Sequence, residues 1–198
     1  IFNATQEHDS EVYLDNIPLT MPSLGSLVMY CRLNQTNGES ITSIHFDNTK
    51  LSDKHMSLIA SFILFTPNLS ELTLSENFIT SDGLLLILDQ FAKCKKIRKI
   101  DLSSNFIDDT GCCSLAGILE NLSLKELNLS RNELTGISAR KLIYSLNKHD
   151  SELQKLNLSY NQLGDGAAAL AALLMTIHNP VIKYINLAFC GITSDGLT

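Results

Sequence analysis

One eleven-residue pattern returns six times along the chain and constrains its fold more than any other feature. The copies align without gaps and place apolar residues at positions one, four, six and eleven. They begin at Ile41, Leu69, Ile97, Leu124, Leu153 and Ile182, which are 27 to 29 residues apart. Such a period predicts similar structural units that stack on one another, because a single unit is too small to bury its own apolar face.

Each unit is predicted to contain one strand and one helix. Inside the pattern, positions four and six alternate with polar residues, as on a short strand with one face toward a core. Between the copies, apolar residues recur with helical spacing, for example in residues 56–63. Residues 81–83 and 108–111 offer N-cap oxygens for helix starts, and Pro67 and Pro180 favour helix ends before them. The sequence therefore predicts a parallel sheet on the inside of an arc.

The six copies match the form L-x-x-L-x-L-x-x-N/C-x-L. The ninth position is occupied in turn by Thr49, Asn77, Asn105, Asn132, Asn161 and Cys190. In these features the chain resembles leucine-rich repeat proteins, and its long period is similar to that of the ribonuclease-inhibitor-like subfamily. The resemblance covers Ile41 to the C-terminus. It implies an α/β fold, a curved leucine-rich repeat solenoid or horseshoe arc, with a parallel β-sheet on the concave face and helices on the convex face.

The residues at position nine are predicted to be structural. An Asn side chain both donates and accepts hydrogen bonds, so it can satisfy backbone groups in the tight turn that follows each strand. Thr49 and Cys190 keep a smaller polar group at this position. This structural ladder is therefore expected to weaken toward both ends of the chain.

Two regions are expected. Residues 41–198 form six leucine-rich repeats, the last one truncated. Residues 1–40 match the pattern poorly and are predicted to be an N-terminal cap or a degenerate first repeat, with a strand near Val12 and a helix over residues 22–34. A solenoid needs such an end unit to shield its core from water. Because the chain starts at Ile and stops at a helix start, we interpret it as a piece of a longer protein.

Positions two, three, five, seven and eight of each copy are predicted to project from the concave face. Position three carries alternating charges at Glu71, Lys99, Glu126 and Lys155. Strands about 4.8 Å apart bring such charges close enough to pair with one another. Positions five and seven are mostly Asn and Ser, for which we favour a structural role over hydrogen bonds to a partner.

Aromatic residues gather on the concave side of the last two repeats. Aromatic and Arg side chains dominate protein-binding hot spots, because they bury a large area at little entropic cost. The candidate partner-binding residues are Arg131, Tyr160, Tyr184, Phe189, Asp101, Glu76 and His45. The alternative interpretation is that further repeats downstream simply cover Tyr184 and Phe189.

Charge and hydropathy narrow the kind of partner. The formal net charge is −6, and the sequence shows no basic stripe that would neutralise phosphates. The longest apolar run, residues 58–65, is far shorter than the roughly 20 residues of a membrane span. We therefore predict a protein partner, no binding to nucleic acid or membrane, and a monomeric module within a longer chain.

The cysteines indicate a reducing environment. The chain has five, an odd number, without the spacing of a metal site. Reduced thiols fit a cytoplasmic location, which is the host cytosol if the chain is a secreted bacterial effector. The vicinal pair Cys112 and Cys113 is predicted to be packed and inert, although a helix N-terminus at this point is able to lower a thiol pKa.

Catalysis and metal binding are not expected. Ser43, His45 and Asp47 alternate along one strand, but side chains on one face are roughly 6.5 Å apart, whereas a nucleophile and its base need ~2.6–3.2 Å. A metal site made of His45, Asp47 and Glu76 is disfavoured as well. We predict that the chain is not an enzyme, holds no metal and uses no cofactor.

The leading functional hypothesis is a protein–protein interaction module that binds its partner on the concave face, as part of a longer regulator or effector. One alternative is a regulator that activates a small GTPase, because the repeat period resembles that of Ran GTPase-activating proteins. A second alternative is a purely structural spacer. Ribonuclease inhibition is disfavoured, since ribonuclease inhibitors are rich in Cys and carry Trp on the binding side, while this chain has five Cys and no Trp.

Overall fold

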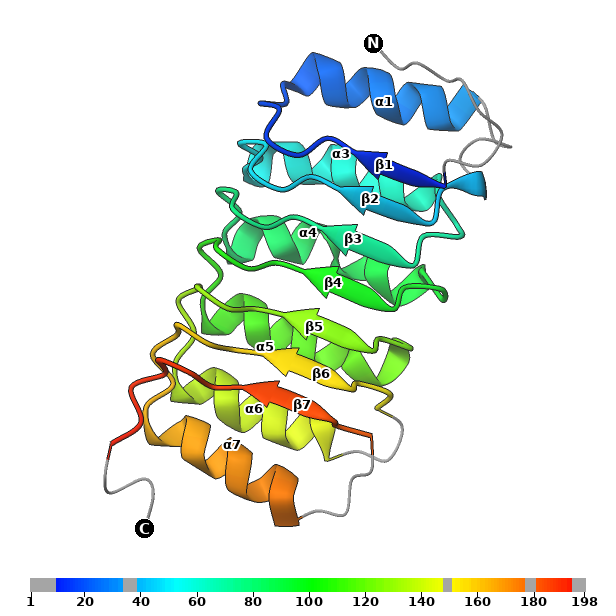
Figure 1. Ribbon diagram of the computed structural model, residues 1–198. Helices are drawn as coiled ribbons and strands as arrows, with labels where there is room; N and C mark the ends of the chain where they lie inside the picture. The colour runs from blue at the N-terminus through cyan, green and yellow to red at the C-terminus, as the bar shows by residue number, and fades with distance from the viewer. Residues whose placement is uncertain (1–9, 34–38, 148–150, 177–180, 194–198) are drawn as a thin grey trace.

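The computed structural model describes residues 10–33, 39–147, 151–176 and 181–193. Strands and helices alternate along the chain (Figure 1). Their order is β1 (Glu11–Tyr13), α1 (Met21–Leu33), β2 (Ser43–His45), α3 (Asp53–Leu64), β3 (Glu71–Thr73), α4 (Ser81–Lys93), β4 (Lys99–Asp101), α5 (Asp109–Ile118), the short 3₁₀ helix η1 (Leu119–Asn121), β5 (Glu126–Asn128), α6 (Gly136–Leu146), β6 (Lys155–Asn157), α7 (Asp165–Thr176) and β7 (Tyr184–Asn186).

The strands form a single parallel sheet in the order in which they occur in the sequence, from β1 to β7. Equivalent residues of neighbouring repeats are paired, so that Ile44 lies beside Leu72 and Leu72 beside Ile100. The helices all lie behind this sheet, and Figure 1 shows the repeats as a stack of similar layers. The predicted fold class, a leucine-rich repeat solenoid with a parallel sheet on one face and helices on the other, is confirmed.

The core lies between the sheet and the helices, and the apolar pattern positions build it. In the repeat that begins at Leu69, all four pattern residues are fully buried, and helix α4 adds Leu84, Ile87 and Phe91. The last repeat differs, because Ile182 and Ile185 are only partly buried. The apolar residues are thus fully buried in the middle repeats and less buried in the last described repeat.

Residues before Ile41 carry a strand and a helix of their own. Strand β1 pairs in register with β2, and helix α1 packs against α3. Leu24, Leu27 and Cys31 of α1 are buried in the same core as the repeats that follow. The sheet therefore begins one strand before the first clear copy of the pattern.

The residues at position nine form a ladder of buried amides. Asn105 Oδ1 accepts the backbone N–H of Ile79, while its Nδ2 donates to the carbonyl oxygens of Leu74 and Leu102. Each amide thus bonds its own turn, as predicted, and also the preceding repeat. The last residue of the ladder makes fewer contacts. The Cys190 thiol donates to the carbonyl oxygen of Leu158, with Sγ at 3.2 Å from that oxygen.

Helix starts are capped across repeats. The Asp109 carboxylate, at the start of α5, accepts hydrogen bonds from the backbone N–H and the hydroxyl of both Thr135 and Ser138 in the next repeat. Asp53 accepts from Thr80, the N-cap of α4, in the same way. Helix α4 begins at Ser81, but its N-cap oxygen belongs to Thr80, one residue before the range 81–83 that was predicted to supply it.

Among the described residues, no helix is long and apolar enough to cross a membrane.

Candidate protein-binding face

The position-three side chains form the predicted charge ladder on the strands. Lys99 Nζ lies 2.6 Å from Glu71 Oε1, and Lys155 Nζ lies 2.6 Å from Glu126 Oε1. The contact with Glu71 raises the pKa of Lys99. The prediction that these charges pair with one another is confirmed, so this column satisfies itself before any partner arrives.

Positions five and seven are joined by hydrogen bonds. Asp101 Oδ1 accepts from the backbone N–H and the hydroxyl of Ser103, and Asp101 Oδ2 accepts from Asn128 Nδ2. The same pattern recurs between Asn157 and Ser159, whose side chain is buried. These contacts support the structural interpretation, and Asp101, a candidate partner contact, already uses both carboxylate oxygens within the sheet.

Position eight, one of the positions predicted to project from the concave face, lies in the turn after each strand. Each strand ends at position five, and all six residues at position eight have a positive φ. They are Asn48, Glu76, Ser104, Arg131, Tyr160 and Phe189, with φ between 52° and 58°. A left-handed backbone turns the chain sharply here, so these side chains gather along the edge where the strands end.

Three of these turn residues form one continuous stack. Arg131 Cζ lies 4.1 Å from the centroid of the Tyr160 ring. Phe189 also stacks on Tyr160, with ring centroids 4.6 Å apart and an interplanar angle of 17°. Tyr160 is 42% exposed and Phe189 73% exposed. We call Arg131, Tyr160 and Phe189 the turn stack.

Tyr184 lies on strand β7, apart from the turn stack in sequence but on the same two repeats. It borders a shallow hollow of about 170 Å³ on the sheet, together with Lys99, Asp101, Asn128 and Lys155 among others. The hollow thus combines an exposed aromatic ring with charged and amide groups.

At the opposite end of the sheet, His45 contacts two hydroxyl groups. Its Nε2 lies 3.0 Å from Ser43 Oγ and its Nδ1 lies 3.2 Å from Thr73 Oγ1. The predicted separation of Ser43 and His45 is therefore wrong, because the long side chain of His45 brings its Nε2 to the Ser43 hydroxyl although the two Cα atoms are far apart. Nevertheless, Nδ1 meets a hydroxyl rather than the carboxylate of Asp47, which instead accepts the backbone N–H of Ser75.

Sequence reasoning missed a second aromatic pair. Phe78 and Phe106, at position ten, stack with ring centroids 6.3 Å apart and are both about half exposed. Each also joins an isolated parallel bridge, with Ser52 and Thr80 respectively. The two residues are 28 residues apart, the length of one repeat, and this spacing could have revealed the pair. Position ten was not among the positions predicted to project from the concave face.

The vicinal cysteines Cys112 and Cys113 lie in the first turns of helix α5. Burial raises the pKa of the Cys112 thiol to about 12. Burial, followed by the charge of Asp109, raises the pKa of the half-buried Cys113 thiol as well. Both pKa values are thus shifted in the direction opposite to the lowering that a helix N-terminus would cause. Cys112 is packed as predicted, whereas Cys113 is only half-buried.

Comparison with known families agrees with this geometry. A family model described as leucine-rich repeat matches four successive segments, residues 93–116, 120–142, 149–171 and 178–198. The chain is a leucine-rich repeat protein. Its repeats outside these segments show the same β–α unit and the same paired strand register.

Among curated proteins, this leucine-rich repeat chain is similar to the ribonuclease inhibitor of Mus musculus, with 31% identity over 115 residues. The alignment covers 57% of the chain but only 25% of the inhibitor, so the match spans about a quarter of that relative's length. Among solved structures, it is similar in fold to the actin-binding site 2 domain of leiomodin-1, with a TM-score of 0.52 and 13% identity over 86% of this chain and 81% of that one.

Proposed function

We propose that this leucine-rich repeat chain binds a protein partner, and that the turn stack and Tyr184 make the principal contacts. Leucine-rich repeat proteins act as protein-interaction modules, and the similar mouse protein is named for inhibiting another protein, a ribonuclease. The binding surface is part of this proposal, and the partner is to be identified by the experiment below.

The exposed turn stack is the observation that carries this proposal. Stacking on both sides fixes the Tyr160 ring before a partner binds, so little side-chain entropy remains to be lost on binding. Fixed aromatic rings with an adjacent Arg are the side chains that most often dominate binding energy. Such a surface is suited to an apolar or aromatic side chain of the partner, surrounded by polar contacts.

The charges of the sheet lie around Tyr184, the proposed contact outside the turn stack. Lys99 and Lys155 are neutralised by Glu71 and Glu126, so this part of the face offers paired charges rather than a field of one sign. Specificity then depends on shape and local hydrogen bonds more than on long-range attraction. We therefore expect binding to weaken little between low and physiological salt.

The proposal is tested with two variants that each remove three exposed aromatic rings. The first carries Tyr160→Ala, Tyr184→Ala and Phe189→Ala. The control carries Phe78→Ala, Phe106→Ala and Tyr144→Ala, which lie at position ten and on helix α6. Proteins captured from a cell lysate are identified by mass spectrometry, and the affinity of each purified candidate is then measured by calorimetry.

The expected result is a partner whose affinity falls by at least tenfold in the first variant and is unchanged in the control. An equal loss in both variants contradicts the assignment to the turn stack. If no purified candidate binds, the spacer alternative is favoured. If a small GTPase binds and its GTP hydrolysis accelerates, the alternative of a GTPase-activating regulator is favoured instead.

A further inference from the structure

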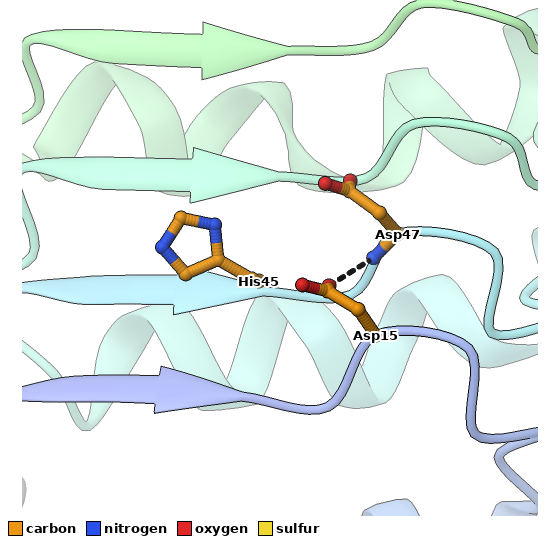
Figure 2. A group of neighbouring side chains, drawn as sticks. All are labelled: Asp15, His45 and Asp47. Atoms are coloured by element: carbon orange, nitrogen blue, oxygen red, sulfur yellow. Dashed lines mark hydrogen bonds between the residues drawn. The ribbon is translucent and has the colours of Figure 1, made fainter.

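Three potential metal ligands meet at the N-terminal end of the sheet. Asp15 and Asp47 follow β1 and β2 at equivalent positions, and His45 ends β2 (Figure 2). One ligand atom from each residue lies within 4.8 Å of the other two. All three residues are half-buried, so an ion would be partly shielded yet reachable from solvent.

The imidazole ring of His45 is held in place by groups outside this cluster. Tyr13 stacks on it, with ring centroids 4.4 Å apart and an interplanar angle of 4°. Ser43 Oγ lies 3.0 Å from Nε2. Thr73 Oγ1 lies 3.2 Å from Nδ1, so a metal ion at Nδ1 would take the place of this hydroxyl contact. A ring that donates its Nε2 proton to Ser43 would then present the Nδ1 lone pair to the ion, as metal-binding histidines do when their second nitrogen is hydrogen-bonded.

The two carboxylates are oriented by the backbone. Asp15 Oδ1 accepts the N–H of Asp47 at 2.8 Å, and Asp47 Oδ1 accepts the N–H of Ser75 at 2.8 Å (Figure 2 shows the first bond). Hydrogen bonds within the described part of the chain use only Oδ1 of each group, which leaves Oδ2 for another ligand.

Charge gives a further reason for a cation at this point. Two carboxylates lie side by side, and within the described ranges neither forms an ion pair with a Lys or Arg. Elsewhere on the same sheet, Glu71 and Glu126 each have a Lys at 2.6 Å. A divalent cation between Asp15 and Asp47 would replace their mutual repulsion by attraction.

We propose that Asp15, His45 and Asp47 bind one divalent transition-metal ion of the zinc class, with water as the fourth ligand. The ligands are His45 Nδ1 and one oxygen of each carboxylate. The centre of a triangle with sides of 4.8 Å lies about 2.8 Å from its corners, so shifts of under about 1 Å reach the ~2.0–2.2 Å of zinc bonds. An imidazole ligand favours zinc over calcium or magnesium, which prefer oxygen alone.

The cluster differs from the set of His45, Asp47 and Glu76 that was considered as a metal site from the sequence. Asp15 joins His45 and Asp47, whereas Glu76 lies one repeat further on, exposed in its turn. A bound ion would link the first strand of the sheet to the second. It would therefore stabilise the N-terminal end of the solenoid against opening.

The test is calorimetric titration of the metal-free chain with ZnCl₂, in a Cys113→Ser background that removes the half-exposed thiol. The test variant carries Asp15→Asn and Asp47→Asn, since Asn keeps an oxygen for the backbone N–H while removing the charge. The matched control carries Asp89→Asn and Glu133→Gln, which removes two exposed carboxylates elsewhere. A third variant carries His45→Gln.

We expect one zinc ion per chain, an affinity at least tenfold weaker in the Asp15/Asp47 and His45 variants, and an unchanged affinity in the control. Calcium should bind at least tenfold more weakly than zinc. Unchanged zinc affinity in the Asp15/Asp47 or the His45 variant, equal losses in test and control variants, or no saturable one-to-one binding would each overturn the proposal. Melting temperatures without metal verify that all variants are folded.

Discussion

At the scale of single residues, the buried asparagines replace hydrogen bonds that water would otherwise supply. Asn105 is 5% exposed and bonds the backbone of two repeats through both ends of its amide. A parallel sheet of three-residue strands leaves many backbone groups of the adjoining turns without a strand partner. A side-chain amide in each turn bonds these backbone groups. This explains why a polar Asn occupies a buried position that an apolar residue could not satisfy.

Replacing Asn105 by Ala should therefore be costly. The change leaves the N–H of Ile79 buried without its partner, at a cost of about 1–3 kcal/mol, whereas the carbonyl of Leu74 keeps the hydrogen bond from Asn77. We expect the free energy of unfolding in urea to fall by about 2 kcal/mol. Asn121→Ala, at an exposed position of η1, is the control. A loss below about 1 kcal/mol for Asn105→Ala would show that water replaces the amide.

At the scale of elements, helices α4 and α6 depend on a carboxylate of the preceding repeat for hydrogen bonds at their N-termini. The carboxylate of Asp109 accepts four hydrogen bonds from Thr135 and Ser138 at the start of α6. Burial on its own would raise the pKa of Asp109, but the hydrogen bonds from Ser138 and Thr135 outweigh it and lower the pKa. A negative charge at a helix N-terminus is also favoured by the helix dipole.

Asp109→Ala is predicted to destabilise the chain by about 2 kcal/mol at neutral pH, because a charged acceptor of several hydrogen bonds is lost. Since the folded-state pKa of Asp109 is lowered, its contribution is complete above the unfolded pKa and is lost as the pH falls through the folded pKa. Urea denaturation should thus show the difference between parent and variant shrinking below about pH 4.

Asp165→Ala provides the comparison for this cap. Asp165 makes the equivalent contact with Thr193, but this contact is exposed to solvent. Its loss should cost less than half as much as the loss of Asp109. If both variants lose the same free energy of unfolding, the burial of the cap is not what gives Asp109 its effect.

At the scale of the whole molecule, the chain is a row in which each unit contacts its neighbours. Within the described ranges, each strand pairs only with the strands adjacent to it in sequence, and the principal helix packing joins successive helices. Stability in such a row is close to a sum of unit stabilities and interface terms. A change at one end should therefore loosen that end first, without a uniform effect on the rest.

Leu24→Ala tests this row-like behaviour. Leu24 is fully buried in α1, and truncation of such a side chain costs about 2–5 kcal/mol. Hydrogen–deuterium exchange should accelerate in β1 and α1, to a lesser degree in β2 and α3, and not in β5 and β6. Uniform acceleration across the chain would instead indicate one cooperative unit.

The candidate binding face was predicted only in part. Arg131, Tyr160 and Phe189 were recognised from their column in the repeat, but their contact with one another and their place in the turns were not. The positive φ at position eight has no residue signature here, because Glu, Arg, Tyr and Phe all adopt it rather than Gly. The turn itself imposes this backbone, so no pattern of residue types reveals it.

The sequence by itself determined the fold. Apolar residues at fixed positions and a period of 27 to 29 residues are satisfied only by stacked units that share one core. The tertiary structure decided which side chains meet. Asp15 and Asp47 are 32 residues apart, and Tyr160 and Phe189 are 29 apart. They become neighbours because parallel pairing in register brings equivalent positions of adjacent strands to about 4.8 Å, where side-chain conformation decides each contact.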